Sequence, residues 1–242
     1  MPVDDNGLDI TSGIQNYPDA RFALITPAHQ SPLGVALSLA RRHQILEWAD
    51  RSQAWIIEDD YDSEFRYHGK PLPALKSLDA PQRVIYAGTF SKALFPALRC
   101  AWLVVPVKQI TQFRHQASLA PCAVPVLWQN TLADFLREGH FWRHLKKMRQ
   151  HYAQRRQWIE QALTQQGFQV VPQKGGIQMV IRMIGDDIAH ARKANAAGLA
   201  VQALSDWRIR SSGEGGLLLS FTNIVNEGMA RKVAQQLRKA LS

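Results

Sequence analysis

Cysteine and long apolar runs are the features that this sequence has least of. Only Cys100 and Cys122 occur among its 242 residues, and they form no metal-binding or redox spacing. We interpret both as reduced thiols, which are typical of a cytoplasmic protein. No apolar run approaches the roughly 20 residues needed to cross a bilayer, and the N-terminus lacks the pattern of a signal peptide. We therefore expect a cytoplasmic protein with no membrane partner.

Acidic residues are fewer than basic ones, and the net charge is +9. Such an excess can indicate a nucleic-acid partner. The basic residues are spread along the chain, however, and form adjacent pairs in helix-like stretches at Arg41-Arg42, Lys146-Lys147, Arg155-Arg156 and Arg231-Lys232. Pairs of this kind usually form solvated helix faces. Because the sequence also has no zinc-finger or basic-zipper pattern and no convincing helix-turn-helix, we do not expect this chain to bind DNA directly.

The first part of the chain alternates strand-like and helix-like stretches. Short apolar runs predict buried strands at Arg21–Thr26, Ala54–Glu58, Arg83–Ala87 and Ala101–Val105. Leu37–Gln53 has the spacing of a helix, with one side formed by Leu37, Ala40, Ile45, Trp48 and Ala49. Short apolar strands separated by helices or long loops predict an α/β sheet.

The remainder of the chain predicts a long helix followed by a small α+β domain. Apolar residues keep helical spacing from His140 to about Gln166, and Gly167 ends the pattern. Strands are expected at Phe168–Val171, Ile177–Met183, Trp207–Arg210 and Leu217–Phe221, and helices at Asp186–Ala197 and after an Asn226 cap. We accordingly divide the chain into residues 1–139 and residues 140–242.

The stretch Gly88-Thr89-Phe90-Ser91-Lys92 follows the third strand directly, with Arg99 seven residues later. Gly88 permits a sharp turn, and the hydroxyls and the guanidinium together suit a phosphate dianion. A lysine beside that anion can form an imine with an aldehyde. The alternative interpretation is a surface lysine on a structural turn.

Acidic residues cluster where the second strand ends, in the run from Glu58 to Glu64. Ligands of open α/β sheets gather at the carboxyl ends of strands. A carboxylate there can keep a pyridinium nitrogen protonated, and Tyr61 can hydrogen-bond a phenolic oxygen. A Mg²⁺ or Ca²⁺ site and a solvated acidic turn remain equally open, although the spacing does not match an EF-hand.

The loop Thr26-Pro27-Ala28-His29-Gln30-Ser31-Pro32-Leu33-Gly34 follows the first strand. Its two prolines and its glycine predict a rigid turn. His29 can donate to a ligand oxygen, although a loop histidine satisfied by its own neighbours is the commoner case.

The order of these motifs resembles the fold-type-I pyridoxal-phosphate (PLP) enzymes of the aspartate-aminotransferase superfamily. The match is closer to the aminotransferase-like domain of MocR-type transcriptional regulators in the GntR superfamily. It rests on TPAHQSPLG, RRHQILEWA, IIEDDYDSEFRY, LPALKSLD, VIYAGTFSK and PALR, and EGHFWRHLKKMRQHYAQRR resembles the long helix of that family. The resemblance covers nearly the whole chain and implies a class I/II aminotransferase-like domain with a mostly parallel sheet and a small C-terminal domain.

The resemblance also implies roles for particular residues. Lys92 is expected to form the Schiff base with PLP, and Asp59 to pair with the pyridine nitrogen. Tyr61 is expected to contact the ring oxygen, with His29 near the position where aminotransferases place an asparagine. The residues expected to face the phosphate are Thr89, Ser91 and Arg99.

Two departures from the family shape the expected function. The winged helix-turn-helix and the start of the large domain have no counterpart here, so we expect a fragment that binds DNA only through the missing N-terminal domain. Near Leu217–Phe221, where aminotransferases carry an arginine for a substrate carboxylate, Asn223 stands instead. Arg208 and Arg210 lie nearby in sequence. A metalloprotein without PLP remains a third possibility.

We expect the effector-sensing part of a regulator, with a small amino-group effector and a homodimeric parent. The alternative is an aminotransferase acting on an amino acid or an amine.

Overall fold

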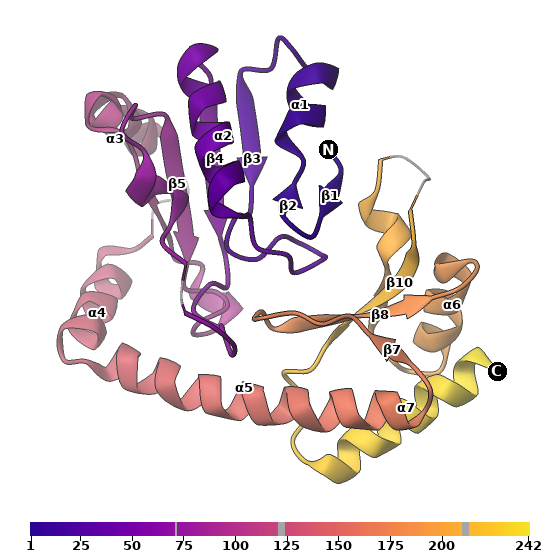
Figure 1. Ribbon diagram of the computed structural model, residues 1–242. Helices are drawn as coiled ribbons and strands as arrows, with labels where there is room; N and C mark the ends of the chain where they lie inside the picture. The colour runs from indigo at the N-terminus through magenta and orange to yellow at the C-terminus, as the bar shows by residue number, and fades with distance from the viewer. Residues whose placement is uncertain (71, 121–123, 210–212) are drawn as a thin grey trace. The chain divides into compact units, whose positions relative to one another are not determined.

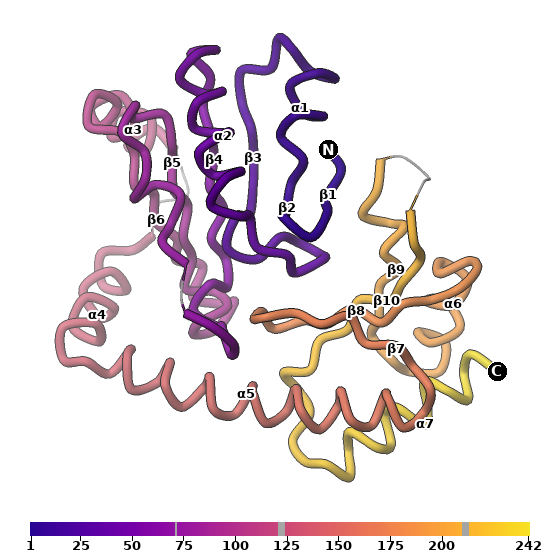
Figure 2. The backbone as a smooth tube through the Cα atoms, in the orientation of Figure 1, coloured from indigo at the N-terminus to yellow at the C-terminus, as the bar shows by residue number. Residues whose placement is uncertain are grey.

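The structure is a computed structural model that describes residues 1–70, 72–120, 124–209 and 213–242. The chain forms two compact units, drawn as ribbon and backbone in Figures 1 and 2. Unit 1 comprises Met1–Ser31, Val35–Glu64 and Gly69–Leu145, and unit 2 comprises Pro32–Gly34, Phe65–His68 and Lys146–Ser242. Cys122 and Arg210 lie outside the described residues.

The sheet of unit 1 has four strands in the order β3-β4-β5-β6. They are β3 (Phe22–Ile25), β4 (Trp55–Asp60), β5 (Val84–Thr89) and β6 (Ala101–Val104). The first three are parallel, and β6 is antiparallel to β5. The α/β fold and the mostly parallel sheet predicted from the sequence are therefore confirmed. The expected burial of the fourth strand is wrong, because Leu103 and Val104 of β6 are 55% and 45% exposed.

The register of the parallel strands brings their carboxyl ends to one edge of the sheet. Ile25 of β3 lies opposite Glu58 of β4. Asp60 of β4 lies opposite Gly88 of β5. The three loops that carry the motifs leave the sheet at this edge.

Two helices cover one face of this sheet, as Figure 1 shows for α1 (Ile10–Asn16) and α2 (Leu39–Arg51). The side chains that face this core include Ala23, Ile25, Ile45, Trp48, Ala49, Ile56 and Val84. Three of the five apolar residues assigned to the inner face of the helix, Ile45, Trp48 and Ala49, are confirmed there. Leu37 is buried just before the helix begins, but Ala40 is exposed.

The remaining elements of unit 1 are short or peripheral. They are β1 (Val3–Asp4), β2 (Gly7–Leu8), α3 (Ile110–Leu119), α4 (Val126–Arg137) and the 3₁₀ segments Leu75–Leu78, Pro96–Leu98 and Val107–Gln109. Helix α5 (His140–Gln165) begins in unit 1 and continues in unit 2. Gly167 follows it with φ +81°, a conformation that glycine adopts without strain. The predicted long helix is confirmed.

Unit 2 is built on an antiparallel sheet in the order β7-β8-β10-β9. Its strands are β7 (Gln169–Val170), β8 (Gln178–Met183), β9 (Val201–Ala203) and β10 (Gly215–Ser220), and its further helices are α6 (Asp187–Ala196) and α7 (Glu227–Leu241). The core of the unit includes Leu163, Met179, Ile181, Leu217, Phe221 and Leu237.

The ends of these elements test two sequence predictions. The Asn226 side chain caps α7 by accepting a hydrogen bond from Met229 N at 2.8 Å, as predicted. The strand expected at Trp207–Arg210 is wrong, because its described residues follow or end the 3₁₀ segment Leu204–Trp207. The strand at this place is β9, which ends before the segment.

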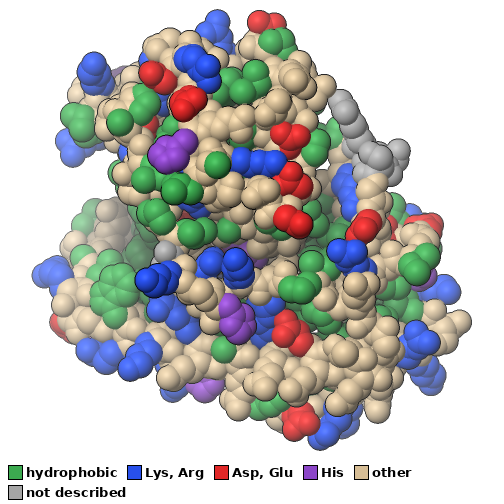
Figure 3. Space-filling model, in the orientation of Figure 1, with side chains coloured by type: hydrophobic (Ala, Val, Ile, Leu, Met, Phe, Trp, Pro, Cys, Tyr) green, Lys and Arg blue, Asp and Glu red, His purple; other side chains and the backbone are tan. Residues whose placement is uncertain are grey.

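Two arginines depart from the expected solvated helix faces. Arg42 is 2% exposed, and its guanidinium donates to the carbonyls of Leu37, Pro73 and Pro27 at 2.7–2.9 Å. Arg156 is also buried and pairs with Glu160 at 2.7 Å. The other pair members lie at the surface or are partly exposed, and Figure 3 shows Lys and Arg side chains dispersed over the visible face. Among the described helices, none is both long and apolar enough to cross a membrane.

Candidate functional site

The acidic motif begins inside β4 rather than after it. Side chains of a strand alternate between the two faces of the sheet, so Glu58 and Asp59 point in opposite directions. Glu58 is 1% exposed and accepts hydrogen bonds from the backbone N–H groups of Leu75 and Lys76, both at 2.7 Å. Burial raises the pKa of the Glu58 carboxyl, although these two bonds oppose the shift. Glu58 thus anchors the 3₁₀ segment at Leu75–Leu78.

Asp59 lies on the other face of the sheet and is partly buried. Burial raises the pKa of its carboxyl, and the neighbouring carboxylates of Asp60 and Asp62 raise it further. A carboxyl whose charge is disfavoured gains from a cationic or proton-donating partner. Asp59 is therefore suited to pair with a protonated ring nitrogen.

Asp60 is held by hydroxyl groups on both sides. Its Oδ2 accepts from Ser63 Oγ at 2.7 Å and from Tyr86 Oη at 2.8 Å. Burial and the Asp60 carboxylate raise the pKa of Tyr86, so its hydroxyl keeps its proton and donates. Because Glu58 and Asp60 are engaged by different partners, the carboxylates do not converge. Within the described residues, no group of three or more potential ligands could hold a metal ion.

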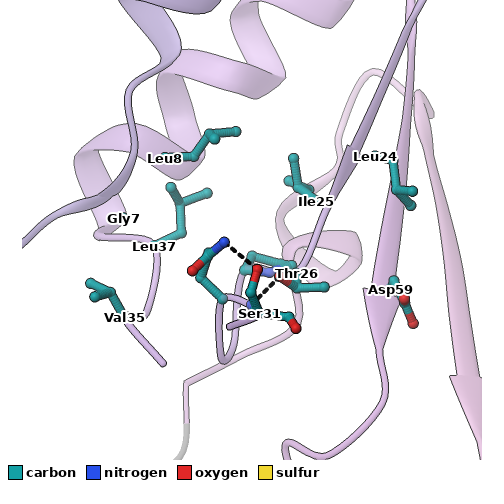
Figure 4. Close-up of a pocket in the computed structure, with 11 residues that line it drawn as sticks. Gly7, Leu8, Leu24, Ile25, Thr26, Ser31, Val35, Leu37 and Asp59 are labelled. Atoms are coloured by element: carbon teal, nitrogen blue, oxygen red, sulfur yellow. Dashed lines mark hydrogen bonds between the residues drawn. The ribbon is translucent and has the colours of Figure 1, made fainter. Parts of the chain in front are cut away.

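A pocket of about 220 Å³ joins Asp59 to the loop after β3. It is lined by Gly7, Leu8, Leu24, Ile25, Thr26, Pro27, Gln30, Ser31, Val35, Leu37 and Asp59. Figure 4 shows Asp59 on the strand beside Thr26 and Ser31, whose backbone N–H donates to Thr26 Oγ1 at 3.2 Å. The pocket is smaller than the roughly 300–1,000 Å³ typical of sites that enclose a cofactor.

His29 and Tyr61 contact each other next to this pocket without lining it. His29 is 8% exposed, and its Nδ1 lies 3.2 Å from Tyr61 Oη. The Tyr61 hydroxyl donates to the backbone carbonyl of His29, also at 3.2 Å. Burial, followed by the Asp62 carboxylate, raises the pKa of Tyr61, so this hydroxyl stays protonated. The sequence motifs after β3 and within β4 therefore meet.

Thr89 and Ser91 form the hydroxyl cluster that the sequence predicted. Ser91 N donates to Thr89 Oγ1 at 3.1 Å, and the two hydroxyl oxygens are 3.0 Å apart. Gly88 precedes them at a point where a side chain would overlap the Trp102 indole of β6. The two hydroxyls thus lie next to each other where β5 ends.

Lys92 and Arg99 occupy the turn that follows. Both side chains are exposed, and within the described part of the chain no hydrogen bond or ion pair holds the Lys92 ammonium. Arg99 has a left-handed backbone (φ 49°), which residues other than glycine adopt rarely and often at functional sites. Neither residue lines the pocket beside Asp59.

The structure adds one residue to which no sequence motif gave a role. Asp62 is 2% exposed, and its Oδ1 lies 3.3 Å from His29 Nδ1. Its place in the acidic run was visible in the sequence. Its contact with His29, 33 positions earlier, depends on how the two loops fold and could not be read from spacing.

Comparison with known proteins places this geometry in a family. The pattern described as aminotransferase class I and II matches residues 4–213. The chain is 35% identical over 99% of its length to the probable rhizopine catabolism regulatory protein MocR of Rhizobium meliloti, and covers 49% of that protein. It is 31% identical over its whole length to the pyridoxine biosynthesis regulator PdxR of Corynebacterium glutamicum, covering 52%. The chain thus spans about half the length of these curated relatives.

Solved aminotransferases share the fold. The Pyrococcus horikoshii kynurenine aminotransferase, solved with PMP, superposes with a TM-score of 0.88 at 24% identity, over 100% of this chain and 62% of that one. The Thermus thermophilus α-aminoadipate aminotransferase LysN, complexed with N-(5′-phosphopyridoxyl)-L-leucine, gives 0.86 at 25% identity, over 100% and 64%. The chain described here belongs to the aminotransferase class I and II family.

Proposed function

We propose that this chain is the lysine-bearing part of a PLP-binding, effector-sensing domain of a MocR/GntR-type transcriptional regulator. Family membership and the match to MocR and PdxR along the whole chain support the proposal. The observation that carries it is the strand register, which brings the acidic motif of β4 and the Gly88–Lys92 motif to one sheet edge. Residues 1–139 then belong to the large domain, and residues 140–242 form the connecting helix and the small domain.

The donor set at this edge fits PLP. Asp59, with its raised pKa, suits the pyridine nitrogen. The clustered hydroxyls of Thr89 and Ser91 suit the phosphate. A buried ring nitrogen, Nε2 of His29, has no hydrogen-bond partner among the described residues and is available to a ligand.

Each remaining residue has a role in this arrangement. PLP supplies an aldehyde and an electron-withdrawing ring when it is bound. Lys92 would hold PLP covalently through the aldehyde carbon, with water as the leaving group. Its amine is exposed and has no partner among the described residues. Arg99 adds a guanidinium to the phosphate contacts. Tyr61 contacts the ring oxygen, with His29 beside it.

Sensing follows from competition for the aldehyde. A small compound with an amino group would compete with the Lys92 amine for this aldehyde, and a released Lys92 side chain would change the contacts made by its turn. That difference would bias the arrangement of a homodimeric parent in the cytoplasm and of its DNA-binding domain.

The second candidate is an aminotransferase acting on an amino acid or an amine. It is favoured by the likeness to an aromatic-amino-acid aminotransferase of Thermococcus litoralis, 28% identical over 67% of this chain. Against it stands Asn223, just after β10, where an arginine would hold a substrate carboxylate.

Turnover separates the two candidates. The chain is loaded with PLP and mixed with amino acids and amines, and both the absorbance spectrum and the 2-oxo acid or aldehyde product are followed. A sensor shows a spectral change without more than one equivalent of product. Repeated turnover that is lost in Lys92→Ala and kept in Lys108→Ala, an exposed lysine outside the motif, would establish the enzyme instead.

A further inference from the structure

His29 and Asp62 form a buried pair whose polar groups are only partly satisfied. The two side chains are 8% and 2% exposed, and His29 Nδ1 lies 3.3 Å from Asp62 Oδ1. Neither Asp62 oxygen accepts a well-formed hydrogen bond, and His29 Nε2 has no partner, within the described part of the chain. Buried polar atoms without partners are costly and rare, and they often mark a place where a ligand binds.

Asp62 and Tyr61 both lie beside Nδ1 of His29, and together they favour a proton on this nitrogen. A tyrosine hydroxyl has one proton, and that of Tyr61 is donated to the His29 carbonyl at 3.2 Å. In that arrangement its oxygen can accept from His29 Nδ1, which lies 3.2 Å away. The Asp62 carboxylate beside Nδ1 favours the same assignment, because a lone pair at that position would face a negative charge.

The unpaired Nε2 is then the ring atom that can meet a ligand. If this atom also takes a proton, the imidazolium and the Asp62 carboxylate form a neutral pair, which removes the cost of an isolated buried charge. A second proton on a buried Nε2 requires an acceptor. An anionic oxygen on a ligand supplies one.

We propose that Asp62 is a positioning residue that orients His29 and balances its charge, so that Nε2–H donates to the phenolate oxygen of the PLP ring. This inference rests on the proposed function. The His29 ring takes one proton from solvent when that oxygen binds, and no other bond forms or breaks. Histidines that act on ligands are commonly oriented by a carboxylate on the other ring nitrogen.

The charge of Asp62 also acts on Asp59, the carboxyl proposed to pair with the pyridine nitrogen. After burial and the Asp60 carboxylate, Asp62 is the third cause of the raised pKa of Asp59. The groups that surround His29 are thus Tyr61 and Asp62 in direct contact, with Asp59 and Asp60 coupled to them through charge.

The ¹⁵N spectrum of histidine-labelled chain tests the proposal directly, with the His29 signals assigned by His29→Gln. The probe is 4′-deoxypyridoxine phosphate, which keeps the ring oxygen but has no aldehyde and so does not depend on Lys92. We expect a proton on Nδ1 alone in the free chain and on both nitrogens with the probe. In Asp62→Asn the second proton should be absent, and probe affinity should fall on the order of tenfold.

Two further variants separate positioning from general effects of charge or folding. Asp60→Asn removes the same charge from the same motif, but Asp60 contacts Ser63 and Tyr86 rather than His29. It should leave the His29 signals unchanged, whereas Asp62→Glu should restore the second proton in part.

A proton on Nε2 alone in the free wild-type chain would overturn the inference. So would a saturating probe that leaves the His29 signals unchanged, or equal effects of Asp60→Asn and Asp62→Asn. The proposed function fails separately, if PLP itself never attaches to Lys92.

Discussion

The Asp59 carboxyl is protonated at higher pH in the folded chain than in the unfolded chain, because burial and the charges of Asp60 and Asp62 raise its pKa. As pH rises from the unfolded value of 3.8 through the raised folded value, the unfolded chain loses its proton first. Stability therefore falls across this window and stays lowered at neutral pH. A carboxylate that serves ligand binding is expected to lower the stability of the folded chain in this manner.

Replacing Asp59 with asparagine should remove that cost. At pH 7 we expect Asp59→Asn to raise the melting temperature by up to about 4 °C, with the difference vanishing below about pH 4. Thermal denaturation followed by circular dichroism across this pH range measures it. Asp50→Asn, at an exposed position in α2, should show no such dependence. A lower melting temperature for Asp59→Asn at pH 7 would show that the carboxylate stabilises the chain.

At the scale of single elements, Arg42 connects α2 to two loops. Its guanidinium donates to the carbonyls of Leu37 and Pro73 at 2.9 and 2.7 Å from a position that is 2% exposed. These are loop carbonyls at the edge of the core. Arg42 therefore ties α2 to the residues just before the 3₁₀ segment, whose first N–H groups donate to Glu58.

Arg42→Met should keep the volume and lose these bonds. We expect unfolding in urea to require at least about 2 kcal/mol less free energy, because buried carbonyls lose their donors. The free energy of unfolding of Arg42→Lys should lie between those of the wild type and Arg42→Met, since an ammonium cannot reproduce the fork of a guanidinium. The matched control is Arg51→Met on the exposed side of α2, where little change is expected. Equal stabilities for the Arg42 and Arg51 variants would contradict this account.

The elements differ in how far the sequence predicted them. The apolar runs located β3, β4, β5 and β6 to within two residues at each end. Apolar runs mark strands, but they do not show whether a covering layer is present, and β6 is largely exposed. The antiparallel direction of β6 and the short β1, β2 and α1 depend on tertiary pairing, which periodicity does not report. The strand expected at Trp207–Arg210 was wrong because the apolar pattern there is only a few residues long. So short a pattern does not distinguish a strand from a 3₁₀ turn.

In the candidate site, too, the sequence predicted some features and missed others. The order of its three loops followed from strand ends and turn residues, and the parallel register confirmed it. The pairing of His29 with Asp62, and the burial of Arg42, depend on where the loops close in space. No spacing in the sequence predicts such contacts.

At the scale of the whole molecule, one face of the unit 1 sheet carries exposed apolar side chains among the described residues. Ala23 and Ile25 point into the core with α2, so Phe22 and Leu24 point the other way, and they are 62% and 66% exposed. On β6, Leu103 is 55% exposed and pairs with Ala87. Exposed apolar patches of this kind are prone to association.

We expect the isolated chain to bind a hydrophobic dye and to self-associate as its concentration rises. Phe22→Thr with Leu24→Thr should lower dye fluorescence several-fold and shift sedimentation toward the monomer, while strand propensity is kept. Ile184→Thr, at a fully exposed position in unit 2, should change neither. Unchanged association in the double variant would show that another surface is responsible.

Peptide mapping shows which lysine PLP attaches to, and therefore whether Lys92 is the Schiff-base residue. The chain is incubated with PLP, reduced with borohydride, digested and analysed by mass spectrometry, beside Lys92→Ala and Lys108→Ala. We expect one phosphopyridoxyl group on Lys92, lost in Lys92→Ala and retained in Lys108→Ala. A label spread evenly over exposed lysines, or equal labelling of a folded Lys92→Ala chain, would contradict it.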